Sequence, residues 1–333
     1  MPLRSTHWMA VTLALALLAT ACGAPDASDS TQLRGSVVVS GSSTVEPISV
    51  AVTEKFDAGA GHQVSLAVDG PGTGDGFELF CGGQVAINDA SSKIKPEQIA
   101  ACEENGVELI ELWIGNDGLT LLTSESNDHI SCLTLADVYV LIGPESQGVD
   151  NWSDAQDLAV ELGSDTTFPD APLAVTGPGE ESGTFVSFVE LVIEDFNEDR
   201  DVDATTRPDY QSSADDNVII QGVQGSDTSL GWVGFAFARG AEGVKILEVD
   251  GGDGCVRPTD ETVADRSYPI SRPLYIYVNA AMADENPALD AYVDLYLDDT
   301  GISSVREVGY VPLADEDLAA TRSRWHERIV GPA

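Results

Sequence analysis

Basic side chains are scarce in this chain of 333 residues, which carries 16 Lys plus Arg against 56 Asp plus Glu and a formal net charge of −40 at pH 7. Proteins that bind nucleic acids need basic patches to neutralise phosphates, and anionic lipid surfaces repel acidic proteins. The composition therefore argues against a nucleic-acid-binding protein. It also argues against a peripheral membrane protein that binds anionic lipids through basic side chains.

Histidine is equally scarce, with four residues in the chain. A Ser–His–Asp triad needs a histidine base, and His62, His129 and His326 lie in none of the motifs described below. An esterase or phosphatase with Ser43 or Ser182 as nucleophile is the enzymatic alternative, but we expect the chain not to be an enzyme. Because the cysteines form no CxxC pair, we also expect no metal site and no cofactor.

A long apolar run occurs only near the start of the chain. Arg4 and His7 precede an apolar stretch from Val11 to Ala21. This pattern is typical of a signal peptide, and the run is shorter than the ~20 residues that span a bilayer. We predict that residues 1–21 are a signal peptide. Residues 22–34 begin with a stretch rich in Gly, Ala, Asp and Ser, which predicts a flexible tether.

The end of the apolar segment, Leu18-Ala19-Thr20-Ala21-Cys22-Gly23, resembles a bacterial lipobox, in which the cysteine becomes the lipidated first residue of the mature protein. A plain secretory signal followed by an unrelated cysteine is the alternative. Lipidation of Cys22 would place the protein on the outer face of the bacterial cell membrane. The lipid anchor would then be its only attachment to the membrane.

Four cysteines remain after Cys22, and they are an even number in a chain that we expect outside the reducing cytosol. The sequence therefore predicts two disulfides. Three pairings are open at this point; the residues are Cys81, Cys102, Cys132 and Cys255.

The rest of the chain alternates short β-rich runs with helical periodicities. Strands are expected at residues 37–39, 64–68, 119–122, 173–175 and 274–278. Between them, apolar residues recur on one helical face, as in the sets Val45, Ile48, Val52, Phe56 and Phe185, Phe188, Val189, Val192. The alternation predicts an α/β fold. The length is about right for two domains of ~100 to 200 residues each.

Three turns rich in glycine and hydroxyl residues stand where a predicted strand gives way to a helix. They are turn 1 (Gly41-Ser42-Ser43-Thr44-Val45), turn 2 (Gly70-Pro71-Gly72-Thr73-Gly74-Asp75-Gly76) and turn 3 (Gly177-Pro178-Gly179-Glu180-Glu181-Ser182-Gly183-Thr184). A helix N-terminus presents unpaired N–H groups and the positive end of the dipole, and flanking hydroxyls add donors. Glycine lets the backbone approach a ligand closely. Such turns can hold a small anion without a cationic side chain.

Each turn also has a purely structural interpretation. Ser43 and Glu46 have capping-box spacing, and Ser182 is a suitable N-cap, so these hydroxyls could serve only their own helices. Nucleotide binding is disfavoured, because turn 2 lacks the Lys of a Walker loop and no G-x-G-x-x-G is followed by the expected acidic residue. The recurrence of the same design three times favours convergence on one anion.

The same residues resemble a known family. Ser40 to Pro47, Gly72 to Phe77 and Glu181 to Phe185 look like the anion-cradling motifs of the PstS family, the phosphate-binding lipoproteins of bacterial phosphate ABC transporters. Further stretches agree in family order: Ile87 to Ser92, Asp215 to Asn217 with Gln221 to Val223, Leu230 to Gly234, and Ser271 to Leu274. The resemblance spans nearly the whole mature chain, from Gly35 to Val311.

The resemblance implies an α/β fold with two lobes, that of the type II periplasmic binding proteins, with two hinge crossings. The crossings are expected near Trp113 to Asp117 and near Pro269 to Arg272. Lobe I would comprise residues 35–115 and 271–333, and lobe II residues 116–270. The implied disulfides, Cys81–Cys102 and Cys132–Cys255, would then lie one in each lobe.

The function that the resemblance implies is capture of inorganic phosphate between the lobes and delivery to the permease subunits of an ABC transporter. A monomer is expected. The residues expected to bind phosphate are Ser43, Thr44, Val45, Thr73, Gly74, Ser91, Ser182, Gly183 and Thr184. Phosphate keeps a proton at neutral pH, and sulfate does not, so a buried carboxylate would favour phosphate. Asp75 and Asp89 are the candidate proton acceptors.

The chain departs from the family pattern at three positions. Many members carry Asp where this chain has Ser91, and an Arg where it has Pro178. A closer subgroup has an Arg at the position of Ser92. Lys93 is the candidate substitute for the missing cation. Two alternatives follow from these departures: a receptor for sulfate, molybdate or arsenate, and a signalling lipoprotein that does not take part in transport.

Overall fold

The computed structural model describes residues 33–60, 63–180, 182–197, 200 and 202–333. The predicted signal peptide, Cys22 and most of the predicted tether lie outside the described residues. In the part that is described, no helix has both the length and the apolar character needed to span a membrane.

A mixed sheet of nine strands forms the framework, with the strand order β2-β1-β3-β12-β4-β8-β6-β7 and with β9 paired to β4. Three shorter strands form a second sheet in the order β11-β10-β5. The strands are β1 (Gly35–Gly41), β2 (Val64–Asp69), β3 (Ile87–Ala90), β4 (Leu109–Ser124), β5 (Cys132–Thr134), β6 (Val175–Gly177), β7 (Gln211–Ser212), β8 (Leu230–Gly234), β9 (Val244–Ile246), β10 (Glu248–Asp250), β11 (Cys255–Val256) and β12 (Ser271–Asn279).

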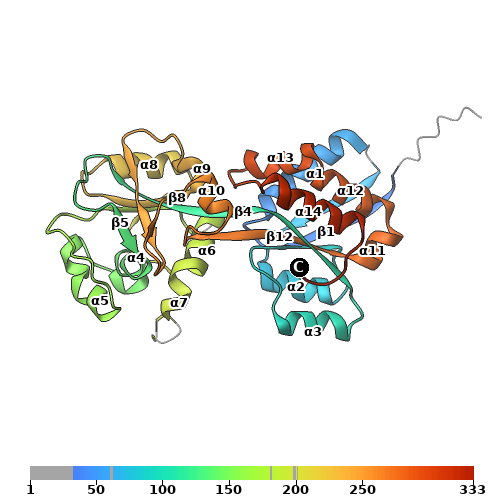
Figure 1. The fold of residues 1–333 in the computed structure, drawn as a ribbon, viewed down its shortest axis with the longest axis horizontal. Helices are drawn as coiled ribbons and strands as arrows, with labels where there is room; N and C mark the ends of the chain where they lie inside the picture. Colours follow the sequence, from blue (N-terminus) through green and yellow to red (C-terminus); the bar gives the residue numbers. More distant parts are fainter. Residues whose placement is uncertain (1–32, 61–62, 181, 198–199, 201) are drawn as a thin grey trace, which may run out of the picture. The chain divides into compact units, whose positions relative to one another are not determined.

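The long strand β4 has different neighbours along its length. Its first part pairs antiparallel with β12, from Leu109 to Gly118, and its last part pairs antiparallel with β8, from Leu119 to Thr123. Figure 1 shows β4 and β12 running side by side between the two groups of helices. Both predicted crossings, near residues 113–117 and 269–272, fall on or beside this strand pair.

Buried side chains form separate cores on either side of the strand pair. One set of core residues comes from Val37 to Ile114 and from Leu274 to Trp325, and we call this part of the molecule lobe I. The other set comes from Leu119 to Ile270 with the addition of Val311, and we call this part lobe II. The exact lobe boundaries, residues 35–115 with 271–333 and residues 116–270, remain a prediction. The side chain of Val311 was not expected in the core of lobe II.

Helices cover both sets of strands. Lobe I holds α1 (Glu46–Ala60), α2 (Thr73–Cys81), α3 (Pro96–Glu104), α11 (Ala280–Glu285), α12 (Pro287–Leu297), α13 (Asp299–Glu307) and α14 (Asp315–His326). Lobe II holds α4 (Leu135–Ile142), α5 (Gln156–Glu161), α6 (Gly183–Phe188), α7 (Glu194–Asn197), α8 (Asp216–Gln224), α9 (Phe235–Ala238) and α10 (Asp260–Ala264). A π-helical turn, Val189–Ile193, joins α6 to α7. The predicted apolar face of α1 is buried, with Val45, Ile48 and Val52 at 0% exposure.

Both disulfides that the resemblance implied are present. Cys81–Cys102 links α2 to α3 across 21 residues of sequence, and Cys132–Cys255 links β5 to β11 across 123 residues. The first bond therefore lies in lobe I and the second in lobe II.

One predicted strand is displaced along the chain. The sequence suggests residues 173–175, and the strand observed is β6, Val175–Gly177. The backbone N–H of Leu173 donates to the carbonyl oxygen of Asp150 at 2.7 Å, so this residue is bonded to a loop. Regular pairing with β8 begins only at Val175.

Candidate functional site

Turns 1 and 2 meet because the strands before them are parallel neighbours. Strands β1 and β2 pair in register from Gly35 with Val64 to Ser40 with Asp69, so both chains leave the sheet at the same edge. The N–H of Gly72 donates to the carbonyl oxygen of Gly41 at 2.8 Å. A Cβ at Gly76 would lie 2.5 Å from the Cα of Gly41, so only glycine allows this approach.

Two of the predicted phosphate-binding residues contact each other at this edge. The hydroxyl oxygens of Thr73, at the start of α2, and Ser91, just after β3, are 3.1 Å apart. The N–H of Ser91 donates to the Thr73 hydroxyl at 3.2 Å. Gly74 is exposed one residue further along α2, with open space where a Cβ would stand. Turn 2 and the end of β3 therefore form one surface with turn 1.

Turn 3 lies against turn 1 even though the two are about 140 residues apart in the sequence. A Cβ at Gly183 would lie 3.5 Å from both the carbonyl oxygen of Ser43 and the Cα of Thr44. Ser182 is the N-cap of α6, and its hydroxyl accepts from the N–H of Thr184 at 3.2 Å. The structure thus brings the predicted residues of turns 1 and 3 together across the two lobes.

Within turn 1, the backbone donors serve the turn itself. The N–H of Thr44 donates to the hydroxyl of Ser42 at 3.2 Å, and the N–H of Val45 donates to the Ser42 carbonyl at 3.1 Å. The acceptor at this helix start is therefore Ser42 and not Ser43, whose spacing to Glu46 suggested a capping box. The half-buried Ser43 lies next to Thr44, which is 1% exposed.

A buried arginine joins the two lobes at this place. Arg272, on β12, is 7% exposed, and its Nη2 donates to the hydroxyl of Thr44 at 3.1 Å and to the hydroxyl of Ser187 on α6. The two hydroxyls are themselves 3.3 Å apart. Arg272 therefore places a positive charge beside turn 1, where the sequence had offered only Lys93 as a candidate cation.

Two carboxylates surround the guanidinium group. Asp117, on β4, lies 3.5 Å from Nε of Arg272 and accepts from the Ser187 hydroxyl at 2.8 Å. Glu190, in the π-helical turn, accepts from Nη1 of Arg272. Burial raises the pKa of Asp117, and the nearby Arg272 and Ser187 lower it in opposition. The cluster of Thr44, Arg272, Ser187, Asp117 and Glu190 is the polar centre between the lobes, and we call it the interlobe cluster.

One residue of the interlobe cluster, Arg272, could have been found from the sequence. Arg272 lies in the Ser271 to Leu274 stretch that resembles the family and falls at a predicted crossing, yet no role was assigned to it. Lys93, the candidate substitute cation, contacts no member of the interlobe cluster among the described residues. Its Nζ donates to the carbonyl oxygen of Ala333 at 3.1 Å and lies 3.9 Å from Glu111, in contacts within lobe I.

Among the described residues, no hydrogen bond joins the side chain of either candidate proton acceptor to a hydroxyl of the three turns. Asp75 is exposed in the first turn of α2. Asp89 is 0% exposed in the core of lobe I, where Ser49 on α1 donates to its Oδ1 at 3.0 Å. Its Oδ2 has no hydrogen-bond partner among the described residues. Burial raises the pKa of Asp89 to about 8, with Glu46 and Asp69 adding to the effect.

The histidines lie away from these turns. His129 is in the loop between β4 and β5, and His326 is the last residue of α14. His62 lies outside the described residues. Among the described residues, no group of three or more His, Cys, Asp or Glu side chains could hold a metal ion.

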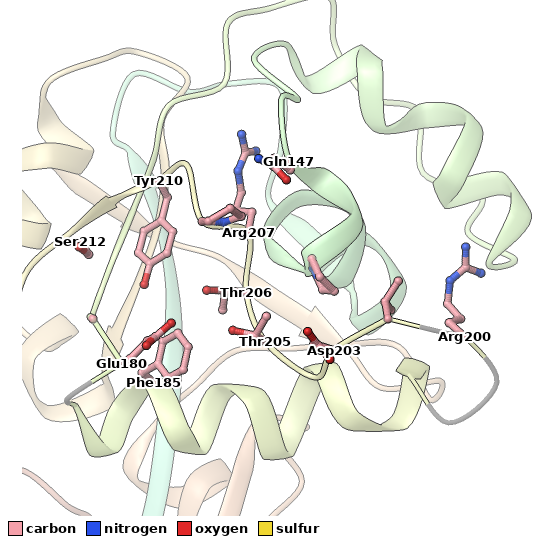
Figure 2. A pocket seen from close by; sticks show the side chains of 14 residues that line it. Gln147, Glu180, Phe185, Arg200, Asp203, Thr205, Thr206, Arg207, Tyr210 and Ser212 are labelled. Atoms are coloured by element: carbon pink, nitrogen blue, oxygen red, sulfur yellow. The ribbon is translucent and has the colours of Figure 1, made fainter.

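A pocket of about 840 Å³ opens within lobe II on the other side of turn 3. Figure 2 shows Phe185 and Tyr210 facing it together with Thr205 and Thr206. Its two arginines are already paired, Arg200 with Glu145 and Glu161 and Arg207 with Asp209. Arg272 in the interlobe cluster is paired with carboxylates as well, so the feature that distinguishes the cluster is its contact with turns 1 and 3 and not the state of its cation.

Comparisons with known proteins agree on one superfamily. The chain matches the model of the PBP superfamily domain over residues 26–300. It is 36% identical to Protein SphX of Synechocystis over 96% of this chain and 90% of that protein. It is 30% identical to the phosphate-binding protein PstS of Staphylococcus saprophyticus over 94% of this chain and 91% of that protein.

A solved structure gives a close spatial match as well. The structure described as a possible phosphate binding protein from Planctomyces limnophilus superposes with a TM-score of 0.80 at 30% identity. The match covers 89% of this chain and 99% of that one. A phosphate transport receptor from Vibrio cholerae has a TM-score of 0.60 at 21% identity, over 83% of this chain and 99% of that one, and shows the shared fold.

Proposed function

This chain belongs to the PstS family of the PBP superfamily, and from that premise we propose that it captures inorganic phosphate at the interlobe cluster and delivers it to an ABC permease. The family consists of extracytoplasmic solute-binding proteins with the two-lobed type II fold, and not of enzymes. The residues that we propose as phosphate ligands are Ser43, Thr44, Val45, Thr73, Gly74, Ser91, Ser182, Gly183 and Thr184, with Arg272 added.

One observation carries the proposal, namely the contact between turns 1 and 3 at a buried arginine. Gly183 lies against the backbone of Ser43 and Thr44, and Arg272 bonds to Thr44 and Ser187 across the same contact. Hydroxyl donors from both lobes and one cation therefore face each other without a bulky side chain between them. This donor set suits a small oxyanion.

The chemistry of capture follows from the donor types. An anion that enters between the lobes exchanges its hydration shell for hydroxyl and N–H donors, and Arg272 supplies the opposite charge. In turn 1 the N–H groups of Thr44 and Val45 must first leave Ser42. The bound anion stabilises the closed conformation, because donors of both lobes coordinate it only when the lobes meet. We propose that the closed form is the state that the permease recognises, and that a lipid on Cys22 anchors the monomer to the outer face of the membrane.

The direct test is titration calorimetry of the purified protein with phosphate, arsenate, sulfate and molybdate. We expect heat with phosphate and a loss of about 2 to 4 kcal/mol of binding free energy in Arg272→Gln, which removes a charge-assisted contact. Arg239→Gln is the matched control, since Arg239 pairs with the exposed Asp260. Absence of heat with every oxyanion would refute the proposal.

A second candidate is a receptor for another tetrahedral oxyanion. Ser91 stands where many relatives carry Asp, and its hydroxyl contacts Thr73, while Asp75 is exposed and Asp89 is buried in the core. The predicted ligand set thus lacks the carboxylate that would select a protonated anion. Sulfate or molybdate binding as tight as phosphate binding in the same titrations would favour this candidate.

A further inference from the structure

The guanidinium of Arg272 is surrounded by protein groups on each of its edges. Nη2 contacts the hydroxyls of Thr44 and Ser187, Nη1 contacts Glu190, and Nε lies 3.5 Å from Asp117 with no hydrogen-bond partner among the described residues. The charge of Arg272 is therefore already compensated by carboxylates when an anion approaches. Access to Arg272 requires that one of these partners gives way.

The two carboxylates differ in their freedom to move. The Asp117 side chain is 3% exposed, lies on the paired strand β4 and is held by the Ser187 hydroxyl at 2.8 Å. The Glu190 side chain is 37% exposed, and Arg272 is its hydrogen-bond partner among the described residues. Because solvent is within reach of Glu190, its carboxylate can leave Arg272 and be hydrated at a small cost. The buried carboxylate of Asp117 cannot move into solvent in the same way.

The local charge also points to Glu190. One guanidinium faces two carboxylates, and Glu194 follows one turn after Glu190 on the same helical segment. Burial raises the pKa of Glu194, and the charge of Glu190 adds to this effect. The negative charge around Arg272 therefore exceeds the positive charge before any anion arrives, and each nearby carboxylate opposes an incoming anion.

We propose that Glu190 limits the affinity of the site, because it is the counter-ion that a bound anion must displace from Arg272. The proposal rests on the proposed function of the interlobe cluster. It assigns Glu190 the role of a built-in competitor that keeps Arg272 neutralised in the empty protein. The same competitor returns when the anion leaves, so it favours release as well as limiting capture.

Titration calorimetry and stopped-flow kinetics with inorganic phosphate test this role. Glu190→Gln should bind phosphate about tenfold more tightly or better, mainly through a slower dissociation rate, because the neutral amide competes weakly for Arg272. Glu194→Gln is the matched control, since it removes the same charge one turn away without contacting Arg272, and its affinity should change less than threefold. Glu190→Ala should shift affinity in the same direction as Glu190→Gln.

The possible outcomes separate this inference from the proposed function. Phosphate binding by the wild type with unchanged or weaker binding in both Glu190 variants would overturn the competitor role and leave the function standing. Equal tightening in Glu190→Gln and Glu194→Gln would also overturn it, since bulk charge would then be the cause. No phosphate binding by the wild type would overturn both proposals.

Discussion

Each lobe buries an aspartate, but the surroundings of the two carboxylates differ. In lobe II, Asp137 is 0% exposed and accepts from Thr134 N–H at 2.8 Å and from the hydroxyls of Ser164 and Thr166 at 2.5 and 2.6 Å. In lobe I, Asp89 accepts from Ser49, and its second oxygen has no partner among the described residues. A fully bonded carboxylate stabilises its loop, whereas a partly bonded one is costly when ionised.

The position of Asp89 relates this difference to the site. Its backbone carbonyl accepts from the N–H of Ser42 at 2.8 Å, so the residue that carries the poorly bonded carboxylate also supports turn 1. Asp137 is the third helical residue in the capping box of α4, in which Thr134 is the N-cap. Its carboxylate therefore stabilises the start of this helix. Lobe I has an ionisable group on the residue whose backbone carbonyl bonds to turn 1, the turn that we propose binds the anion.

The disulfides give the largest expected contrast between the lobes. Loss of Cys132–Cys255 should lower the free energy of unfolding by about 5 kcal/mol, because this bond closes a loop of 123 residues. Loss of Cys81–Cys102, which closes 21 residues, should cost about 3 kcal/mol. Denaturant unfolding of the two double Cys→Ala variants measures both values. A larger loss for the Cys81–Cys102 variant would contradict the loop-length argument.

The aspartates give the next contrast. The pKa of Asp89 is raised to about 8 from 3.8, so the folded protein holds this proton more tightly than the unfolded chain. Its contribution to stability is therefore full below about pH 4 and is lost as the pH rises to about 8. Asp89→Asn should remove this dependence and gain a few kcal/mol over the wild type at pH 9, as an order of magnitude. Urea unfolding between pH 5 and pH 9 measures the difference.

Asp137→Asn is the matched variant in lobe II. An amide has one acceptor oxygen where the carboxylate has two, so a hydroxyl or N–H donor loses its partner. We expect a loss of about 1 to 3 kcal/mol of unfolding free energy at neutral pH. Equal losses in Asp89→Asn and Asp137→Asn at pH 9 would show that the two carboxylates are alike after all.

The hydroxyls of turns 1 and 3 give the smallest contrast. Thr44→Ala should weaken phosphate binding by about 1 to 3 kcal/mol and change the melting temperature little, since Arg272 and Ser187 still bond to each other. Ser182→Ala should weaken binding and also lower stability by about 1 kcal/mol, because Ser182 caps α6. Calorimetry and thermal melting of both variants measure these effects. Unchanged affinity in both would mean that the hydroxyls serve only the protein.

The repeated design of the three turns predicted that they converge, and the parallel pairing of β1 with β2 explains why turns 1 and 2 meet. Two strand-to-helix turns rich in glycine lie at the same edge whenever their strands are parallel neighbours, as β1 and β2 are. The apolar faces of α1 and of the helix after turn 3 followed from their periodicity. The disulfide pairing and the fold followed from the family resemblance.

The interlobe cluster could not be derived in the same way. Arg272 contacts Thr44 across 228 residues and Ser187 across 85, and no local pattern records a contact of that kind. Strand alternation puts Asp89 on one of the two faces of β3, and both faces are buried, so the pattern alone does not say which elements surround this carboxylate. The location of this carboxylate in the core therefore became evident only from the packing of α1 against β3.

The pairing of β4 with β12 also means that one partner strand is synthesised long before the other. The 146 residues from Glu125 to Ile270 separate the end of β4 from the start of β12. A ribosome that adds about 5 to 20 residues per second needs roughly 7 to 30 s to make that segment. During this interval the edge of β4 that later pairs with β12 has no partner, and unpaired edges invite aggregation. We therefore expect a chain with this topology to need protection of the β4 edge until β12, in the last fifth of the sequence, has been made.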